Sequence, residues 1–129
     1  MYTDMHLTGK YHSLLEKYKE SLLFEDGMFN DVNFKGSSED TILHLACLRG
    51  EIQDVIIILE CGAHINAKGD IGATPLHNAV LSDNPLLVKI LIDYGADLKE
   101  KDEFGETPEN WAKNLNKTNA LKAIEEGVK

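Results

Sequence analysis

The sequence is short of positive charge. Its 129 residues include 13 lysines and arginines, with Arg49 the single arginine, against 22 aspartates and glutamates, so the formal net charge is −9. Sequence-independent binding to DNA or RNA depends on cationic contacts to phosphate groups, and an anionic membrane surface makes the same demand. The composition therefore disfavours nucleic acid and membrane partners, and it favours a basic protein as the partner.

The sequence also has few cysteines, no long apolar run and no recognisable secretory signal. Cys47 and Cys61 are too few for a disulfide framework, which suits a reduced compartment. The longest apolar run, residues 55–59, has five residues, whereas a membrane span needs about 18. The N-terminus has no basic region followed by an apolar stretch. We expect a single domain in the cytoplasm, with delivery into another cell by a signal-less route as an open alternative.

A period of 33 residues runs through most of the chain. The hexapeptide TILHLA at 41–46 recurs as TPLHNA at 74–79 and as TPENWA at 107–112. The segment GAHIN at 62–66 aligns at the same offset with GADLK at 95–99. A fixed period of this length indicates supersecondary units that bury their apolar faces by stacking on their neighbours.

These motifs resemble the ankyrin repeat, whose pattern includes a Thr-Pro-Leu-His start and a Gly-Ala-Asp close, and the match covers about residues 36–129. The resemblance implies an all-α solenoid of helix-turn-helix units with short β-hairpin fingers. We expect one domain, 1–129, made of a degenerate N-terminal unit at 8–40, repeats at 41–73 and 74–106, and a C-terminal capping repeat at 107–129.

Local signals agree with helices at these positions. Thr74 and Thr107 are typical N-caps, and each precedes a proline at the first helical position, where a missing N–H costs nothing. Gly62 and Gly95 follow apolar segments and are typical of left-handed C-terminal caps. Glu109 replaces an apolar residue of the earlier units, which indicates the polar outer face of a terminal repeat.

Several positions depart from the pattern. Ile42 stands where proline is expected and Glu39 where the turn glycine is expected, so the first finger should be less regular. Gly69 replaces the usual finger aspartate, and Asp83 replaces the glycine between two helices. These departures put the local shape of the first two fingers in doubt, but not the fold.

The first unit is the most degenerate. Its apolar residues share one helical face by their i, i+3, i+4, i+7 spacing, but the spacing leaves open whether they form two short helices or one bent helix. The unit could serve as a cap or as a docking site. The residues of this face are Tyr11, Leu14, Leu15, Tyr18, Leu22 and Leu23.

The histidines and cysteines offer little for catalysis or metal binding. His44 and His77 hold equivalent positions, where the resemblance implies a structural hydrogen bond to a neighbouring finger. Stacked helices lie ~8–10 Å apart, too far for two such histidines to hold one zinc ion at about 2 Å. Cys47 is expected to pack inside its unit or to be partly exposed, and Cys61 to be exposed. An acidic chain disfavours a reactive thiolate. We expect no enzyme activity, no cofactor and no metal.

The ankyrin resemblance implies a partner-binding surface on the finger tips and on the exposed side of the first helix of each unit. Framework positions are excluded, so the remaining side chains are free to contact a partner. Transferred position by position, this surface comprises Ser38, Asp40, Leu48, Arg49, Asp70, Ile71, Ala73, Leu81, Ser82, Glu103, Phe104, Glu106 and Asn114.

The apolar members of this surface are its most informative part. Ile71 and Phe104 hold equivalent fingertip positions, and groove leucines such as Leu48 and Leu115 extend them into a stripe on a charged face. Apolar or aromatic anchors inside a polar rim are typical of interfaces. In the alternative interpretation, Phe104 folds against Trp111 and is not available.

The function predicted from the sequence is non-catalytic binding of a basic protein through a concave groove and fingers, by a chain that is monomeric on its own. Two narrower alternatives stay open. One is an inhibitor or immunity-type protein that masks a toxin or enzyme, and the other is a host-directed effector or adaptor.

Overall fold

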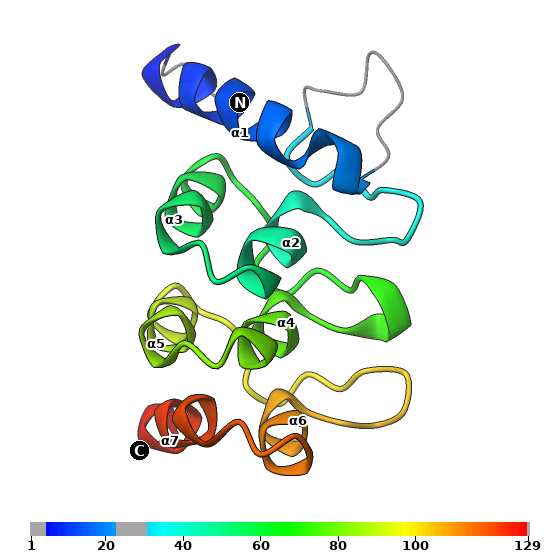
Figure 1. Ribbon diagram of the computed structural model, residues 1–129, viewed down its shortest axis with the longest axis vertical. Coiled ribbons are helices and arrows are strands. Elements are labelled where there is room, and N and C mark those ends of the chain that lie inside the picture. Colours follow the sequence, from blue (N-terminus) through cyan, green and yellow to red (C-terminus); the bar gives the residue numbers. More distant parts are fainter. Residues whose placement is uncertain (1–4, 23–30, 129) are drawn as a thin grey trace.

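The computed structural model describes residues 5–22 and 31–128, and every statement below concerns these residues. In Figure 1 the helices form two columns, with α2, α4 and α6 beside the projecting loops and α3, α5 and α7 on the side away from these loops, while α1 lies across the N-terminal end. The expected all-helical solenoid is therefore confirmed. The elements are α1 (Met5–Leu22), α2 (Ile42–Leu48), α3 (Ile52–Glu60), the 3-10 helix η1 (Asp70–Gly72), α4 (Pro75–Ser82), α5 (Pro85–Asp93), α6 (Pro108–Asn114) and α7 (Thr118–Gly127).

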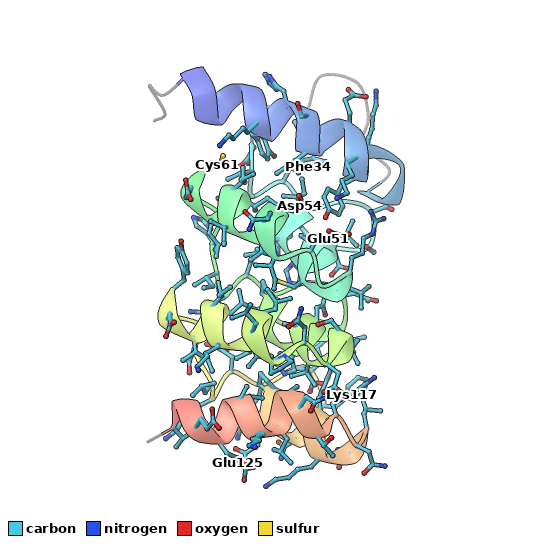
Figure 2. All side chains as sticks on the ribbon, turned by 60° about the vertical axis from the view of Figure 1, so that its left-hand side comes forward. Phe34, Glu51, Asp54, Cys61, Lys117 and Glu125 are labelled. Atoms are coloured by element: carbon cyan, nitrogen blue, oxygen red, sulfur yellow. The ribbon has the colours of Figure 1, made fainter. Side chains whose placement is uncertain are left out.

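The core follows the stack from one end to the other. Helix α2 packs against α4 and α4 against α6, while α5 packs against α7. Equivalent residues such as Leu43 and Leu76 are buried at successive levels, and the buried side chains form one continuous cluster. Figure 2 shows side chains filling the space between layers, with Glu125 on the outer side of the last one. Each layer thus buries its neighbour's apolar face, as a solenoid requires.

Each first helix of a unit begins at a threonine cap. The side chains of Thr41, Thr74 and Thr107 accept a hydrogen bond from the backbone N–H three residues later, and the side chain there accepts one from the threonine N–H. The caps expected at Thr74 and Thr107 are confirmed, and a cap of this kind stabilises a helix by ~1 kcal/mol. Thr41 caps in the same way, although Ile42 follows it in place of proline.

Three loops, at residues 36–40, 69–73 and 102–106, project from the stack, and we call them the first, second and third fingers. In each finger, the backbone N–H of the first residue donates to the carbonyl of the fifth residue at 2.8–2.9 Å. The N–H of the fourth residue donates to the carbonyl of the first residue at 2.9–3.1 Å. The described residues contain no β-strand, so the expected β-hairpins are not confirmed and the fingers are described as tight turns. The prediction of a less regular first finger is wrong, because Glu39 adopts a left-handed φ of 73°, close to the 74° of Gly72 and the 79° of Gly105 in the other fingers.

In the described part of the N-terminal unit there is one helix, α1, where the sequence left open two short helices or one bent helix. Two polar contacts fix it to α3: Tyr18 Oη and Lys17 Nζ each lie 2.7 Å from Asp54 Oδ2. Leu22 and Leu23 of the predicted apolar face lie outside the residues whose side chains are described. The described part of that face is buried and comprises Tyr11, Leu14, Leu15 and Tyr18.

Two departures from the repeat pattern are explained by contacts with neighbouring units. At Gly69, an added Cβ would overlap Asp40 Oδ1 of the first unit and lie 2.8 Å from His44 Nε2 of its own unit, so these two side chains fill that space. Asp83 adopts a left-handed φ of 53°, and its carboxylate accepts a hydrogen bond from the Ala120 N–H at 2.9 Å. That N–H lies in the first turn of α7, where an amide has no partner within its own helix.

Candidate protein-interaction surface

Hydrogen bonds from the histidines of α2 and α4, and one bond between fingers, hold the second and third fingers in position. His44 Nε2 lies 2.9 Å from the Ala73 carbonyl, and His77 Nε2 lies 2.9 Å from the Glu106 carbonyl. Between the second and third fingers, the Glu103 N–H donates to the Ile71 carbonyl at 2.9 Å. The second finger is therefore held by α2, the third by α4 and the two by each other, so the surface made by their tips is preformed.

The protonation of the two histidines follows from these contacts. In each ring, Nδ1 accepts the N–H of the capping threonine, Thr41 or Thr74, so Nε2 must carry the proton that it donates to the finger carbonyl. Burial lowers the pKa of His44 and of His77, opposed in part by the hydrogen bonds to the Ala73 and Glu106 carbonyls. The neutral rings are thus part of the framework, as the sequence interpretation proposed.

Exposure separates the predicted surface residues into three groups. Phe104 is 73% exposed and Ile71 is 39% exposed, so both side chains are accessible to a partner. Ala73 is only 3% exposed, and its prediction as a contact residue is wrong because its carbonyl faces His44 inside the stack. The other exposed members are Ser38, Leu48, Arg49, Asp70, Glu103 and Asn114, and the half-buried ones are Asp40, Leu81, Ser82 and Glu106.

Only part of this surface converges on one place. A shallow pocket of about 370 Å³ lies between the second and third fingers and α6, and we call it the Trp111 pocket. It brings together four of the predicted residues, Ile71, Phe104, Glu106 and Asn114. The other nine lie outside its lining, on the three fingers and at the ends of α2 and α4. Its lining consists of Ile71, Asp102, Phe104, Glu106, Trp111, Asn114 and Leu115.

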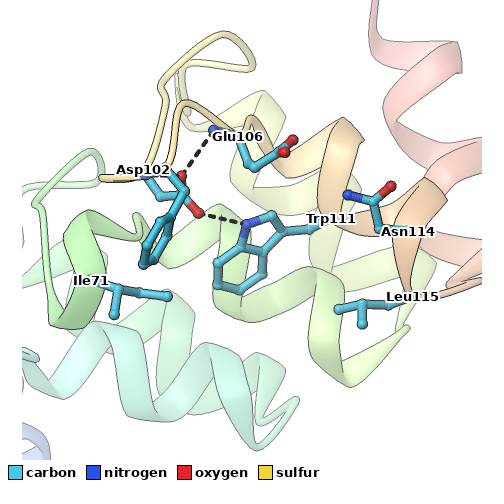
Figure 3. Close-up of a pocket in the computed structure, with 7 residues that line it drawn as sticks. Ile71, Asp102, Glu106, Trp111, Asn114 and Leu115 are labelled. Atoms are coloured by element: carbon cyan, nitrogen blue, oxygen red, sulfur yellow. Dashed lines mark hydrogen bonds between the residues drawn. The ribbon is translucent and has the colours of Figure 1, made fainter.

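Trp111 is the centre of the pocket and is rigidly held (Figure 3). Its indole Nε1 donates to Asp102 Oδ2 at 2.9 Å, and its ring meets the His77 ring edge-on at a centroid distance of 4.8 Å. Asp102 Oδ1 accepts the Phe104 and Glu106 N–H groups at 2.9 Å each. Burial alone would raise the pKa of Asp102, but these three hydrogen bonds outweigh it and the pKa is lowered. The ionised Asp102 therefore ties the third finger to the indole.

Sequence reasoning missed Trp111 and Asp102 as parts of this site. Trp111 was considered only as a surface on which Phe104 could fold. A signal was present, since Trp111 is the single tryptophan and stands where the earlier units have Leu45 and Asn78. A large ring at a position that is smaller in the other repeats indicates a local feature of the last groove.

Unpaired acids surround the pocket. Asp70 and Glu103 are exposed on the fingers beside it and Glu106 lies in its lining. Within the described ranges none of the three forms an ion pair, whereas the nearby Lys68 and Lys113 are engaged with other glutamates. The rim of the pocket is therefore negative and open to a cationic group.

The two cysteines are both free and buried, and neither has the lowered pKa of a reactive thiol. Burial raises the pKa of Cys47 and of Cys61, and for Cys61 the charge of Glu60 adds to the effect. The expectation of an exposed Cys61 is wrong, since it is 6% exposed beneath α1. No cluster of three or more His, Cys, Asp or Glu residues able to hold a metal occurs among the described residues. No described helix could cross a membrane.

Comparison with known families agrees with the architecture. A family model described as ankyrin repeats, three copies long, matches residues 13–102 and residues 54–127, which together span most of the chain. No curated protein matches the chain.

Proposed function

Because the chain belongs to the ankyrin-repeat family, whose repeats generally mediate protein–protein interactions, we propose that it binds a basic protein through its fingers and the groove beside them. The observation that carries this proposal is the Trp111 pocket. Exposed apolar side chains converge there on a rigid indole, and unpaired acids surround them. This is the arrangement of an interface, with apolar anchors inside a polar rim.

The preformed fingers would favour affinity. Binding costs free energy when side chains and loops must be ordered at the interface, ~0.5–1.5 kcal/mol for each immobilised side chain. Here the second and third fingers are already fixed to α2 and α4 by the His44 and His77 hydrogen bonds, and to each other by the Glu103 hydrogen bond. The protein acts as a rigid, non-catalytic platform, monomeric on its own and located in the cytoplasm.

The acidic residues at the rim would act mainly on the rate of association with the partner. Complementary charges at the rim of an interface raise the association rate and make it sensitive to salt. Asp70, Glu103 and Glu106 would steer a basic partner to the groove. The net charge of −9 favours one narrower version of this role, an inhibitor or immunity-type protein that masks a basic surface on a toxin or enzyme. An effector or adaptor would use the same surface.

Affinity capture from the source cell tests the proposal. The wild-type chain is compared with the Ile71→Ala/Phe104→Ala double variant, and Leu86→Ala serves as the control, because Leu86 is 55% exposed on α5 outside the Trp111 pocket. We expect at least one protein to be captured by the wild type and by Leu86→Ala but not by the double variant. Capture of every protein by the double variant would show that the proposed surface is wrong.

A further inference from the structure

The Trp111 pocket has the dimensions of a side-chain site. Its volume of about 370 Å³ lies at the low end of the ~300–1,000 Å³ typical of small-ligand pockets. Ile71 and Phe104 come from two successive fingers, and Trp111 and Leu115 come from the first helix of the last unit and the residue that follows it. The pocket therefore suits one or two side chains of a partner and is too small for a whole helix.

The polar groups of the lining leave an apolar interior. Both oxygens of Asp102 accept hydrogen bonds within the protein, and the indole N–H of Trp111 is donated to one of them. Figure 3 shows the indole between Ile71 and Leu115, with its N–H turned towards Asp102. A polar group placed against this wall would lose its hydration without gaining a partner. The part of the occupant that enters the pocket must therefore be apolar.

The rim sets the charge of what lies beside that apolar group. Glu103 is exposed next to Phe104, and Glu106 is half-buried in the lining. Two nearby lysines are engaged with other acids: Lys113 pairs with Glu109 at 3.2 Å and Lys68 pairs with Glu100 at 2.8 Å. A partner group with a positive charge would gain a favourable interaction here, and an acidic one would be repelled.

We propose that the Trp111 pocket receives one apolar side chain of the protein partner, a leucine, methionine or phenylalanine, while an adjacent lysine or arginine meets Glu103 and Glu106. This inference rests on the proposed function and adds the chemistry of the partner segment to it. Aromatic anchors such as Phe104 and Trp111 carry a large share of the binding energy at interfaces, so truncation of one anchor lowers the affinity about 10- to 30-fold.

Selection from a random peptide library displayed on phage tests the proposed chemistry. The wild-type protein is immobilised, and the Phe104→Ala/Leu115→Ala variant is used in parallel to remove peptides that bind elsewhere. Both substituted residues are exposed, at 73% and 49%, so the fold should survive, and far-UV circular dichroism checks that it does. We expect enriched peptides that carry an apolar residue next to lysine or arginine.

The most enriched peptide is then synthesised and titrated against the full chain. Trp111 is the single tryptophan, so its fluorescence reports on this pocket alone. We expect the emission of Trp111 to change on binding, the affinity to fall at least tenfold in Phe104→Ala/Leu115→Ala, and no change in Leu86→Ala. Replacement of the basic residue of the peptide by glutamate should weaken its binding to the wild-type protein. Added salt should weaken the binding of the original peptide.

Several results would overturn the inference. These are enrichment of acidic or purely polar peptides, binding that leaves Trp111 emission unchanged, and no enrichment over the variant. Toluene that binds and shifts the emission, with no enriched peptide, would instead indicate a small-molecule site. If the captured protein still depends on Ile71 and Phe104 in these cases, the proposed function stands and only the side-chain chemistry is wrong. If no captured protein depends on them, the proposed function fails as well.

Discussion

Two buried tyrosines on α1 allow a sharp test of how the N-terminal helix is fixed. Tyr11 and Tyr18 lie on the same face, with exposed fractions of 7% and 0%. The Tyr18 hydroxyl donates to Asp54 Oδ2 at 2.7 Å. Within the described residues, the Tyr11 hydroxyl is buried with no hydrogen-bond partner. Replacing each tyrosine by phenylalanine removes one oxygen and leaves the packing ring in place.

The two substitutions should change stability in opposite directions. A hydrogen bond to a charged acceptor contributes ~1.5–3 kcal/mol, so Tyr18→Phe should lower the free energy of unfolding by about 2 kcal/mol. An unpaired buried hydroxyl costs ~1–3 kcal/mol of desolvation, so Tyr11→Phe should leave the free energy of unfolding unchanged or raise it by about 1 kcal/mol. In a chain of this size, 1 kcal/mol corresponds to a shift in Tm of roughly 3–5 °C.

Urea unfolding followed by far-UV circular dichroism measures both variants, with equal slopes required before midpoints are compared. Tyr94→Phe is the matched control: Tyr94 is 49% exposed at the end of α5, and surface substitutions usually stay within ~0.5 kcal/mol. A loss in Tyr11→Phe as large as that in Tyr18→Phe would refute the reasoning, because it would mean that the Tyr11 hydroxyl has a partner in the native protein.

Two further predictions concern the framework of the fingers. Burial lowers the pKa of His44 and His77 in the folded protein. Below the ordinary histidine pKa of about 6.5, the unfolded chain therefore binds more protons than the folded one. The contribution of these histidines to the free energy of unfolding should be constant above that pH and should fall as the pH drops below it. A urea midpoint that does not change between pH 7.5 and 5 would contradict this. Gly69→Ala should lower the free energy of unfolding by ~1–3 kcal/mol, because the added methyl group overlaps Asp40. Gly9→Ala, which has open space around it in α1, should instead raise the free energy of unfolding by up to ~1 kcal/mol. Thermal melts measure both variants, and equal effects would contradict the packing argument.

The fold could be predicted because its signals are local and recur. Thr74 and Thr107 begin helices through contacts within three residues, and prolines at the next position reinforce them. Gly62 and Gly95 adopt the left-handed φ of 95° and 98° that the C-caps require. Such signals need no knowledge of the neighbouring unit, so a single sequence contains them in full.

Contacts between units could not be predicted in the same way. Gly69 and Asp83 looked like defects of their own repeats, yet each is matched by a residue of another unit: Asp40 fills the space at Gly69, and Asp83 caps the helix that contains Ala120. Cys61 was misplaced for the same reason, because the helix that covers it comes from the degenerate first unit. A repeat-by-repeat alignment compares equivalent positions and does not show which residues face across an interface.

The candidate site depends both on local signals that recur in the sequence and on contacts between segments that the sequence does not show. The fingertip positions Ile71 and Phe104 follow from the period, but the pocket between them depends on Trp111 and on the carboxylate of Asp102, which orients the indole. Asp102 stands at the finger position where Gly69 replaces the usual aspartate, and its hydrogen bonds with the Phe104 and Glu106 N–H groups lie within the third finger. Its second role appears only when the third finger and α6 are seen together.

The structure also divides the negative charge into two kinds. In residues 20–60, Asp54 and Asp40 are already engaged, the first by Tyr18 and Lys17 and the second by the Asp70 N–H. In residues 93–109, Glu103 and Glu106 have no ion pair among the described residues and lie beside the apolar pocket. Acids that hold the stack together cannot turn to a partner without weakening it. Under the proposed function, the attraction for a basic partner would therefore arise mainly at the third finger, where acids without an ion pair and the exposed aromatic ring coincide.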